Sequence, residues 1–176
     1  MVIIIEGLDG VGKTTTARGF VDKLKELYCD RKFYYVHESH SDDNEFKLIR
    51  KKTLRRLINS EDMFVYDRIT CIDDFVYGFL NKVPSCLKYH KDEILDMLKE
   101  CVIIHLTLDK EEHQKRFFDR GDEFINWSDM EKIENNYKEF YKDLNNVNYF
   151  ELTLDNEKNI DELIRRFYDT NITHSQ

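Results

Sequence analysis

The chain has 176 residues, a net charge of −8 and a sequence pI of about 5.3. This length suits one domain, expected to span residues 1–176, and the acidic balance argues against a nucleic acid polymer as partner. No stretch approaches the roughly 20 apolar residues that a membrane span needs, and the four cysteines are scattered as free thiols would be, so we expect a cytoplasmic protein without membrane contact.

The first predicted element is a buried strand at residues 2–6, followed by the run Gly-Leu-Asp-Gly-Val-Gly-Lys-Thr that begins at Gly7. This run has the complete spacing of a phosphate-binding loop, and a helix is predicted directly after it, at residues 14–27. Gly7 and Gly12 permit the backbone torsions that turn successive N–H groups toward a phosphate. Lys13 is expected to reach the β- and γ-phosphates, and the hydroxyl of the following threonine to help hold Mg²⁺.

Acidic and basic side chains follow the next two predicted strands. Glu38 comes directly after a strand at residues 32–37, and Asp67 and Arg68 follow a strand at residues 63–66. The carboxyl ends of parallel strands meet at one edge of a sheet, where the phosphate-binding loop also lies. We therefore expect these three side chains to face the nucleotide.

A helix is predicted at residues 45–59 from the helical spacing of its apolar side chains. Phe46 and Ile49 belong to the predicted buried stripe, whereas Lys51 belongs to a basic run expected to be mainly a solvated face. The angular position of Arg50 is close to the apolar stripe. This position predicts a guanidinium that is buried or directed at a ligand.

Later elements continue the alternation of strands and helices. Arg116 and Arg120 are four residues apart and share one face of the same predicted helix. Alternation of this kind predicts an α/β fold, a three-layer sandwich around a parallel sheet of about five strands, with the ligand at the carboxyl edge of the sheet. Helices are predicted at 70–80, 89–99, 109–120, 129–144 and 157–168, and strands at 101–106 and 149–152.

A phosphate-binding loop alone does not distinguish switches, motors and kinases. A switch GTPase would show a guanine-selecting Asn-Lys-x-Asp run, but the run at residues 81–84 has proline at its fourth position. An Asp-Arg pair at a strand end with later arginines favours phosphoryl transfer between two small molecules, because several cations neutralise the developing charge.

The order and spacing of these motifs resemble those of the thymidylate kinases over nearly the whole chain. The resemblance implies a P-loop kinase fold with an arginine-bearing lid, ATP and Mg²⁺ as cofactors, and a nucleoside monophosphate as acceptor, with dTMP as the best single guess. Homodimers are common in that family, so a second copy is an expected partner. The resemblance rests on residues 6–15, Asp67-Arg68, Gly78, Leu108-Asp109, Arg116, Arg120 and Leu154-Asp155.

Matching positions imply roles for particular side chains. Asp9 matches the carboxylate associated with the 3′-hydroxyl of the acceptor sugar, Arg68 the arginine that binds the acceptor phosphate, and Asp67 a position near the metal or its waters. Gly10 stands where some members carry an arginine, so Arg116 and Arg120, in a lid at about residues 116–127, are the expected catalytic cations. Motif and resemblance together assign the nucleotide to Gly7, Gly10, Val11, Gly12, Lys13, Thr14, Thr15 and Asn156, the acceptor to Asp9, Glu38, Arg50, Arg68 and Tyr77, and the metal to Thr14 and Asp67.

Departures from the family pattern leave the acceptor open. Thymidylate kinases usually carry Glu-Pro-Gly-Gly-Thr after the second strand, whereas Glu38 is followed here by Ser-His-Ser-Asp. A deoxynucleoside kinase, which phosphorylates a neutral hydroxyl, would use Glu38 as general base. A third interpretation is a regulatory nucleotide-binding protein without catalysis, and the presence of Lys13, Arg68 and the lid arginines argues against it. Four histidines show no ligand-like grouping and are expected to be structural or surface residues, namely His37, His40, His105 and His113.

Overall fold

A five-stranded parallel sheet forms the centre of the structure, a computed structural model that describes residues 1–81, 83–121, 126–145, 148–153, 161–162 and 164–165. The order of the strands is β2-β3-β1-β4-β5, and every pair of neighbours is parallel. The predicted α/β class and the predicted number of strands are confirmed. The strands are β1 (Val2–Gly7), β2 (Phe33–His37), β3 (Met63–Asp67), β4 (Val102–Thr107) and β5 (Tyr149–Thr153).

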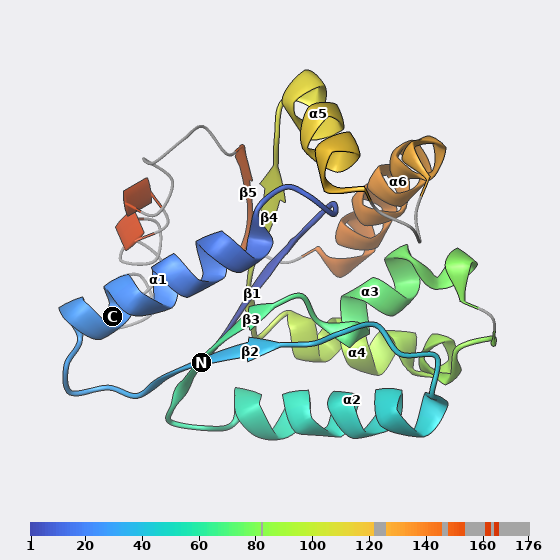
Figure 1. The fold of residues 1–176 in the computed structure, drawn as a ribbon. Helices are drawn as coiled ribbons and strands as arrows, with labels where there is room; N and C mark the ends of the chain where they lie inside the picture. The colour runs from blue at the N-terminus through green and yellow to red at the C-terminus, as the bar shows by residue number, and fades with distance from the viewer. Residues whose placement is uncertain (82, 122–125, 146–147, 154–160, 163, 166–176) are drawn as a thin grey trace.

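Helices cover both faces of this sheet (Figure 1). On one face, α1 packs against Ile3 and Ile5 of β1, and on the other face Val2 and Ile4 contact the helices of a second apolar cluster. Successive side chains of a strand point to opposite faces, so a run of four apolar residues serves both layers. The helices are α1 (Lys13–Leu27), α2 (Asn44–Ile58), α3 (Thr70–Val76), α4 (Lys91–Leu98), α5 (Lys110–Arg120) and α6 (Trp127–Leu144).

The register of the strands brings their carboxyl ends to one edge of the sheet. Ile5 of β1 pairs with Asp67 of β3, and Asp67 in turn pairs with His37 of β2. Gly7 pairs with Leu106 on the other side of β1. The loop after β1 therefore begins beside the ends of β3 and β4, and the end of β2 lies one strand further away.

Several predicted boundaries differ from the structure. The helix predicted at 70–80 is interrupted, because α3 ends at Val76 and a separate 3₁₀ turn follows at Gly78–Leu80, where glycine weakens a helix. A second 3₁₀ turn, Cys86–His90, precedes α4. The helix predicted at 129–144 begins two residues earlier, at Trp127, because Asn126 and Asp129 form a capping box. The helix predicted at 157–168 lies largely outside the described residues.

The predicted faces of α2 are wrong in part. Phe46 and Ile49 are 42% and 50% exposed, whereas Lys47 and Lys51 are 1% and 7% exposed. Each buried ammonium has a carboxylate partner on a neighbouring helix. Lys47 Nζ lies 2.6 Å from Asp74 of α3, and Lys51 Nζ lies 2.5 Å from Glu93 of α4. Ion pairing across helices thus overrides the apolar spacing of the sequence.

No helix in the described part of the chain is both long enough and apolar enough to cross a membrane.

Candidate active site at the carboxyl edge of the sheet

The phosphate-binding loop connects β1 to α1 along the carboxyl edge of the sheet. Gly12 caps α1 in the left-handed region, with a φ of 98°. Gly7 has a φ of 144°, and a Cβ at this position would collide with the carbonyl oxygen of Leu106 on β4. Glycine at both positions lets the loop curve tightly around the start of the helix, where backbone N–H groups and the helix dipole attract phosphate.

Lys13 is the first residue of α1, and its ammonium group lies inside the loop. Nζ donates hydrogen bonds to the carbonyl oxygens of Gly7, at 2.8 Å, and of Leu8, at 2.9 Å, and it lies 3.5 Å from Asp9 Oδ1. Burial, followed by the charge of Arg68, lowers the pKa of Lys13. The side chain is therefore held at the centre of the loop, where a bound phosphate would contact it.

Asp67 receives three hydrogen bonds on one of its carboxylate oxygens. Oδ2 accepts from Thr14 Oγ1 at 2.6 Å and from Tyr35 Oη at 2.8 Å, and it lies 3.0 Å from His37 Nδ1. Oδ1 is buried without a hydrogen-bond partner among the described residues. Hydrogen bonding to Oδ2 fixes the carboxylate at the end of β3, beside the hydroxyl of Thr14 at the start of α1.

The side chains of Thr14 and Asp67, predicted to hold Mg²⁺, are chemically suited to this cation. A hydroxyl from Thr14 and a carboxylate oxygen from Asp67 are oxygen ligands of the kind that Mg²⁺ prefers. The described residues contain no cluster of three His, Cys, Asp or Glu side chains that would hold a metal by protein groups alone. Mg²⁺ in kinase sites is usually bound through one or two protein oxygens, water and substrate phosphates, so this pair is sufficient for that mode.

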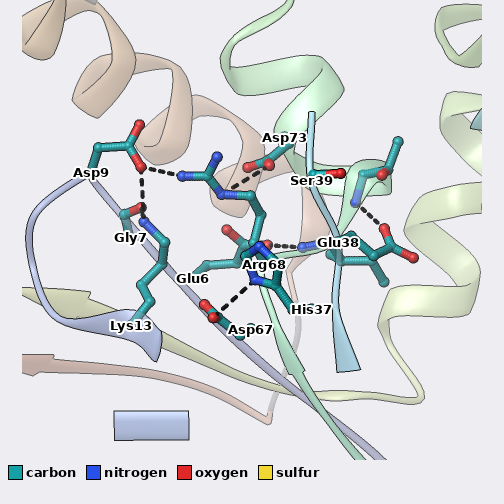
Figure 2. Close-up of polar contacts among 12 residues, drawn as sticks. Glu6, Gly7, Asp9, Lys13, His37, Glu38, Ser39, Asp67, Arg68 and Asp73 are labelled. Atoms are coloured by element: carbon teal, nitrogen blue, oxygen red, sulfur yellow. Dashed lines mark hydrogen bonds and ion pairs between the residues drawn. The ribbon is translucent and has the colours of Figure 1, made fainter. Parts of the chain in front are cut away.

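Arg68 lies between two carboxylates (Figure 2). Its guanidinium forms an ion pair with Asp9 of the loop, and its Nε lies 3.2 Å from Asp73 Oδ2 on α3. Burial alone would lower the pKa of Arg68, but Asp73 and Asp9 outweigh this effect and raise it. The backbone of Arg68 has a φ of 70°, in the left-handed region that residues other than glycine rarely adopt.

Two buried acids beneath this arginine were not recognised from the sequence. Glu6 is completely buried at the end of β1, where it accepts hydrogen bonds from the N–H of Ile69 at 2.7 Å and from Tyr137 Oη at 3.1 Å. Burial raises the pKa of Glu6 well above its usual value and raises that of Asp73 to about 6. In the sequence, Glu6 is the charged residue that follows a run of four apolar residues, and it is the first residue of the motif at 6–15.

Two of the side chains predicted to bind the acceptor are Glu38, in the loop after β2, and Arg50, on α2, and both contact Thr70 at the start of α3. Glu38 is buried, and its Oε2 accepts a hydrogen bond from the N–H of Thr70 at 2.7 Å. Arg50 donates to the carbonyl oxygen of Ser39 at 2.5 Å and to Thr70 Oγ1 at 2.6 Å, and it lies over the ring of Phe46. Arg50 therefore fixes the chain next to Glu38.

Most of the predicted site residues surround a cavity of about 500 Å³. Arg116 reaches this cavity from α5 and forms an ion pair with Glu112 at 2.7 Å. The lining residues are Asp9, Gly10, Gly12, Lys13, Thr14, Thr15, His37, Glu38, Ser39, His40, Asp67, Arg68 and Arg116.

Other predicted site residues lie away from this cavity or beyond the described structure. The side chain of Val11 belongs to the core, and its N–H lies 3.4 Å from the carbonyl oxygen of Leu8. Tyr77 is buried beneath the guanidinium of Arg68, and its hydroxyl has no hydrogen-bond partner among the described residues. Arg120 ends α5, but its side chain is outside the described part of the structure, as are Asn156 and residues 122–125 of the predicted lid.

Three histidines predicted to be structural or surface residues lie at or beside the site, and two of them, His37 and His40, line the cavity. His37 contacts Asp67, and His113 of α5 contacts the backbone of the loop. A possible signal for His37 was its position one residue before Glu38, at the end of a strand. His113 is far from the loop in sequence, and only the three-dimensional packing brings them together.

Comparison with known proteins gives a clear result for the fold. No family model and no curated protein matches the sequence. Among solved structures, the Bacillus subtilis YorR protein in complex with phosphorylated GDP is similar with a TM-score of 0.71 at 21% identity, and the alignment covers 100% of this chain and 99% of that one. Deoxyadenosine kinase from M. mycoides gives 0.63 at 21% identity, covering 96% and 100%. Thymidylate kinase from Candida albicans gives 0.58 at 17% identity, covering 99% and 92%. The chain therefore has the fold of these P-loop proteins over its whole length.

Proposed function

We propose that this chain is an ATP-dependent kinase that transfers the γ-phosphoryl group of ATP to a nucleoside monophosphate, with dTMP as the first acceptor to test. One observation carries the proposal, namely that Lys13, Arg68 and Arg116 line a single cavity together with the phosphate-binding loop. In phosphoryl transfer the charge is spread over several oxygens of the transferring group, and surrounding cations stabilise it. The same fold in a thymidylate kinase and a deoxyadenosine kinase supports this class of reaction.

The site divides into a donor side and an acceptor side. On the donor side, the loop N–H groups and Lys13 would bind the ATP phosphates, and Thr14 and Asp67 would hold Mg²⁺, which neutralises phosphate charge when bound. On the acceptor side, Arg68 is fixed by its two carboxylate partners and would bind the acceptor phosphate. Because such a phosphate is already ionised, transfer to it requires no strong general base.

A deoxynucleoside kinase is the second candidate, and the position of Glu38 favours it. This carboxylate is buried in the wall of the cavity that contains Arg68, and one of its oxygens is fixed by the N–H of Thr70. An oriented carboxylate beside the acceptor suits removal of a proton from a neutral 5′-hydroxyl.

Release of ADP in the presence of a panel of acceptors tests these alternatives. The panel contains dTMP, the other nucleoside monophosphates, thymidine and the other nucleosides, each with MgATP. Turnover of monophosphates supports the first proposal, and turnover of nucleosides alone would reject it in favour of the second. Tight ATP binding without turnover of any acceptor would instead indicate a regulatory nucleotide-binding protein.

A further inference from the structure

A buried histidine connects α5 to the phosphate-binding loop. His113 Nε2 lies 2.6 Å from the main-chain carbonyl oxygen of Asp9, although 104 residues separate the two in sequence. A carbonyl oxygen only accepts hydrogen bonds, so Nε2 carries the proton and donates it. The side chain is 5% exposed, which protects this hydrogen bond from competition by water.

The imidazole ring is held from two further directions. The ring of Trp127, the first residue of α6, lies 5.3 Å from it with an interplanar angle of 60°. A Cβ added to Gly10 would lie 3.7 Å from His113 Cδ2, at ordinary van der Waals distance, so the ring lies beside the loop at Gly10 as well as at Asp9. This packing restricts the orientation of the His113 imidazole. Because the imidazole is also hydrogen-bonded to the loop, the packing restricts the distance between α5 and the loop.

The same helix carries Arg116 into the cavity. Arg116 is three residues after His113, so the two side chains lie on neighbouring positions of one helical face. Arg116 Nε is paired with Glu112 Oε1 at 2.7 Å, one turn before it. The ion pair with Glu112 orients the guanidinium on α5. The distance between the guanidinium and the loop depends on the position of α5 relative to the loop.

We propose that His113 is a positioning residue for the phosphoryl-transfer site. By donating to the Asp9 carbonyl, it sets α5 on the phosphate-binding loop, so that Arg116 faces the same cavity as Lys13. This inference rests on the proposed kinase function for its consequence in catalysis. The contact between helix and loop is a property of the fold and is tested separately below.

Two substitutions separate the hydrogen bond from simple packing. His113→Leu removes the donor and keeps most of the buried volume, whereas His113→Gln places an amide N–H donor near the original Nε2. We expect His113→Leu to lower kcat at least about tenfold while the Kd for ADP, measured by calorimetry, changes less than about threefold, since misplaced catalytic groups impair transfer more than binding. His113→Gln should recover most of the lost kcat. Lys115→Gln, at an exposed position on the same helix, is the matched control and should behave like the wild type.

A double-mutant cycle tests whether His113 acts through Arg116. In an Arg116→Ala background, His113→Leu should lower kcat less than about twofold, because the group that it positions is already absent. An equal fall of kcat in both backgrounds would overturn the inference, as would a His113→Gln variant no better than His113→Leu.

Amide hydrogen exchange of residues 110–120 tests the contact without reference to turnover. Exchange should be faster in His113→Leu than in wild type, His113→Gln and Lys115→Gln, because the helix loses its attachment to the loop. Unchanged exchange in His113→Leu would reject the positioning role even in an active enzyme. If exchange is faster in His113→Leu but the wild-type protein turns over no acceptor, the contact between helix and loop is supported and only the kinase function is rejected.

Discussion

Thr14 Oγ1 and Asp67 Oδ2 lie 2.6 Å apart, although the two residues belong to different elements and are separated by 53 positions. The parallel pairing of β1 with β3 places the end of β3 beside the start of α1, which brings the hydroxyl and the carboxylate together. Tyr35 and His37 of β2 contact the same carboxylate oxygen from the other side. Three side chains, from α1 and β2, therefore orient Asp67.

Asp67→Asn should weaken the use of Mg²⁺. The amide keeps the shape of the side chain but removes the negative charge, so we expect kcat to fall about 100-fold and the Mg²⁺ concentration for half-maximal rate to rise. Rates measured over a Mg²⁺ titration test this, with exposed Glu61→Gln as the control. An unchanged Mg²⁺ titration curve in Asp67→Asn would show that the metal is held elsewhere.

Glu38→Gln should distinguish the two candidate acceptors. If the acceptor is a nucleoside, loss of the general base should lower kcat by about 100-fold or more, and the loss should be smaller at high pH. If the acceptor is a monophosphate, kcat should change much less, because its phosphate is already ionised. The ratio of kcat values for Glu38→Gln and wild type, measured with the best acceptor of each kind, is the decisive quantity.

Arg116→Ala and Arg120→Ala test the predicted division of labour between loop and lid. A cation that acts mainly on the transition state should lower kcat by about 100-fold when removed and leave the Kd for ADP nearly unchanged. Lys13→Ala should instead weaken nucleotide binding as well. Loss of ADP binding with normal kcat in Arg120→Ala would contradict a catalytic role for that side chain.

The buried ion pair between Lys47 and Asp74 allows a test of stability away from the site. Both side chains are almost completely buried, so Lys47→Met leaves the Asp74 carboxylate without its counter-charge and should reduce the free energy of unfolding by about 3 to 5 kcal/mol. The double variant Lys47→Met/Asp74→Leu should recover most of that loss. Urea denaturation of the three proteins gives the comparison, and equal stability of the single and double variants would contradict it.

His105 predicts a loss of stability in mild acid. It is 6% exposed on β4, and burial lowers its pKa to about 4 from 6.5. Between these values the unfolded chain binds a proton that the folded chain does not, so the free energy of unfolding falls as the pH is lowered from 6.5 toward 4. The contribution lost by pH 5 is about 2 kcal/mol.

His105→Phe removes this titration and isolates its effect. The free energies of unfolding of wild type and His105→Phe are measured by urea denaturation at pH 7 and at pH 5. The difference between the two proteins should change by about 2 kcal/mol between these pH values. Parallel pH profiles for wild type and His105→Phe would show that His105 titrates normally.

Much of the fold could be predicted because the sequence carries local signals for it. The apolar run of β1 and the glycine spacing of the loop depend on neighbouring residues, and both were recognised correctly. Asp67 and Arg68 were placed at the sheet edge from their position after an apolar strand. In each of these cases the signal lies in residues that are adjacent in the sequence and belong to the same local structure.

The rest depends on contacts between distant segments. Lys47 and Lys51 are buried because each forms an ion pair with a carboxylate on another helix, Asp74 and Glu93 respectively. The spacing of residues within α2 cannot predict these partners. Asp73 and His113 likewise acquire their positions from packing against the loop region. Their identities are visible in the sequence, but their partners are not.

The central position of β1 also affects how the chain folds during synthesis. Among the five strands, β1 leaves the ribosome first, yet its neighbours β3 and β4 follow only after α1 and several further elements. Pairings of such high sequence separation form slowly and leave apolar segments unprotected. Until β4 emerges, the Val2–Ile5 segment lacks one of its two neighbouring strands, so nascent chains that end before residue 102 should depend most strongly on chaperones.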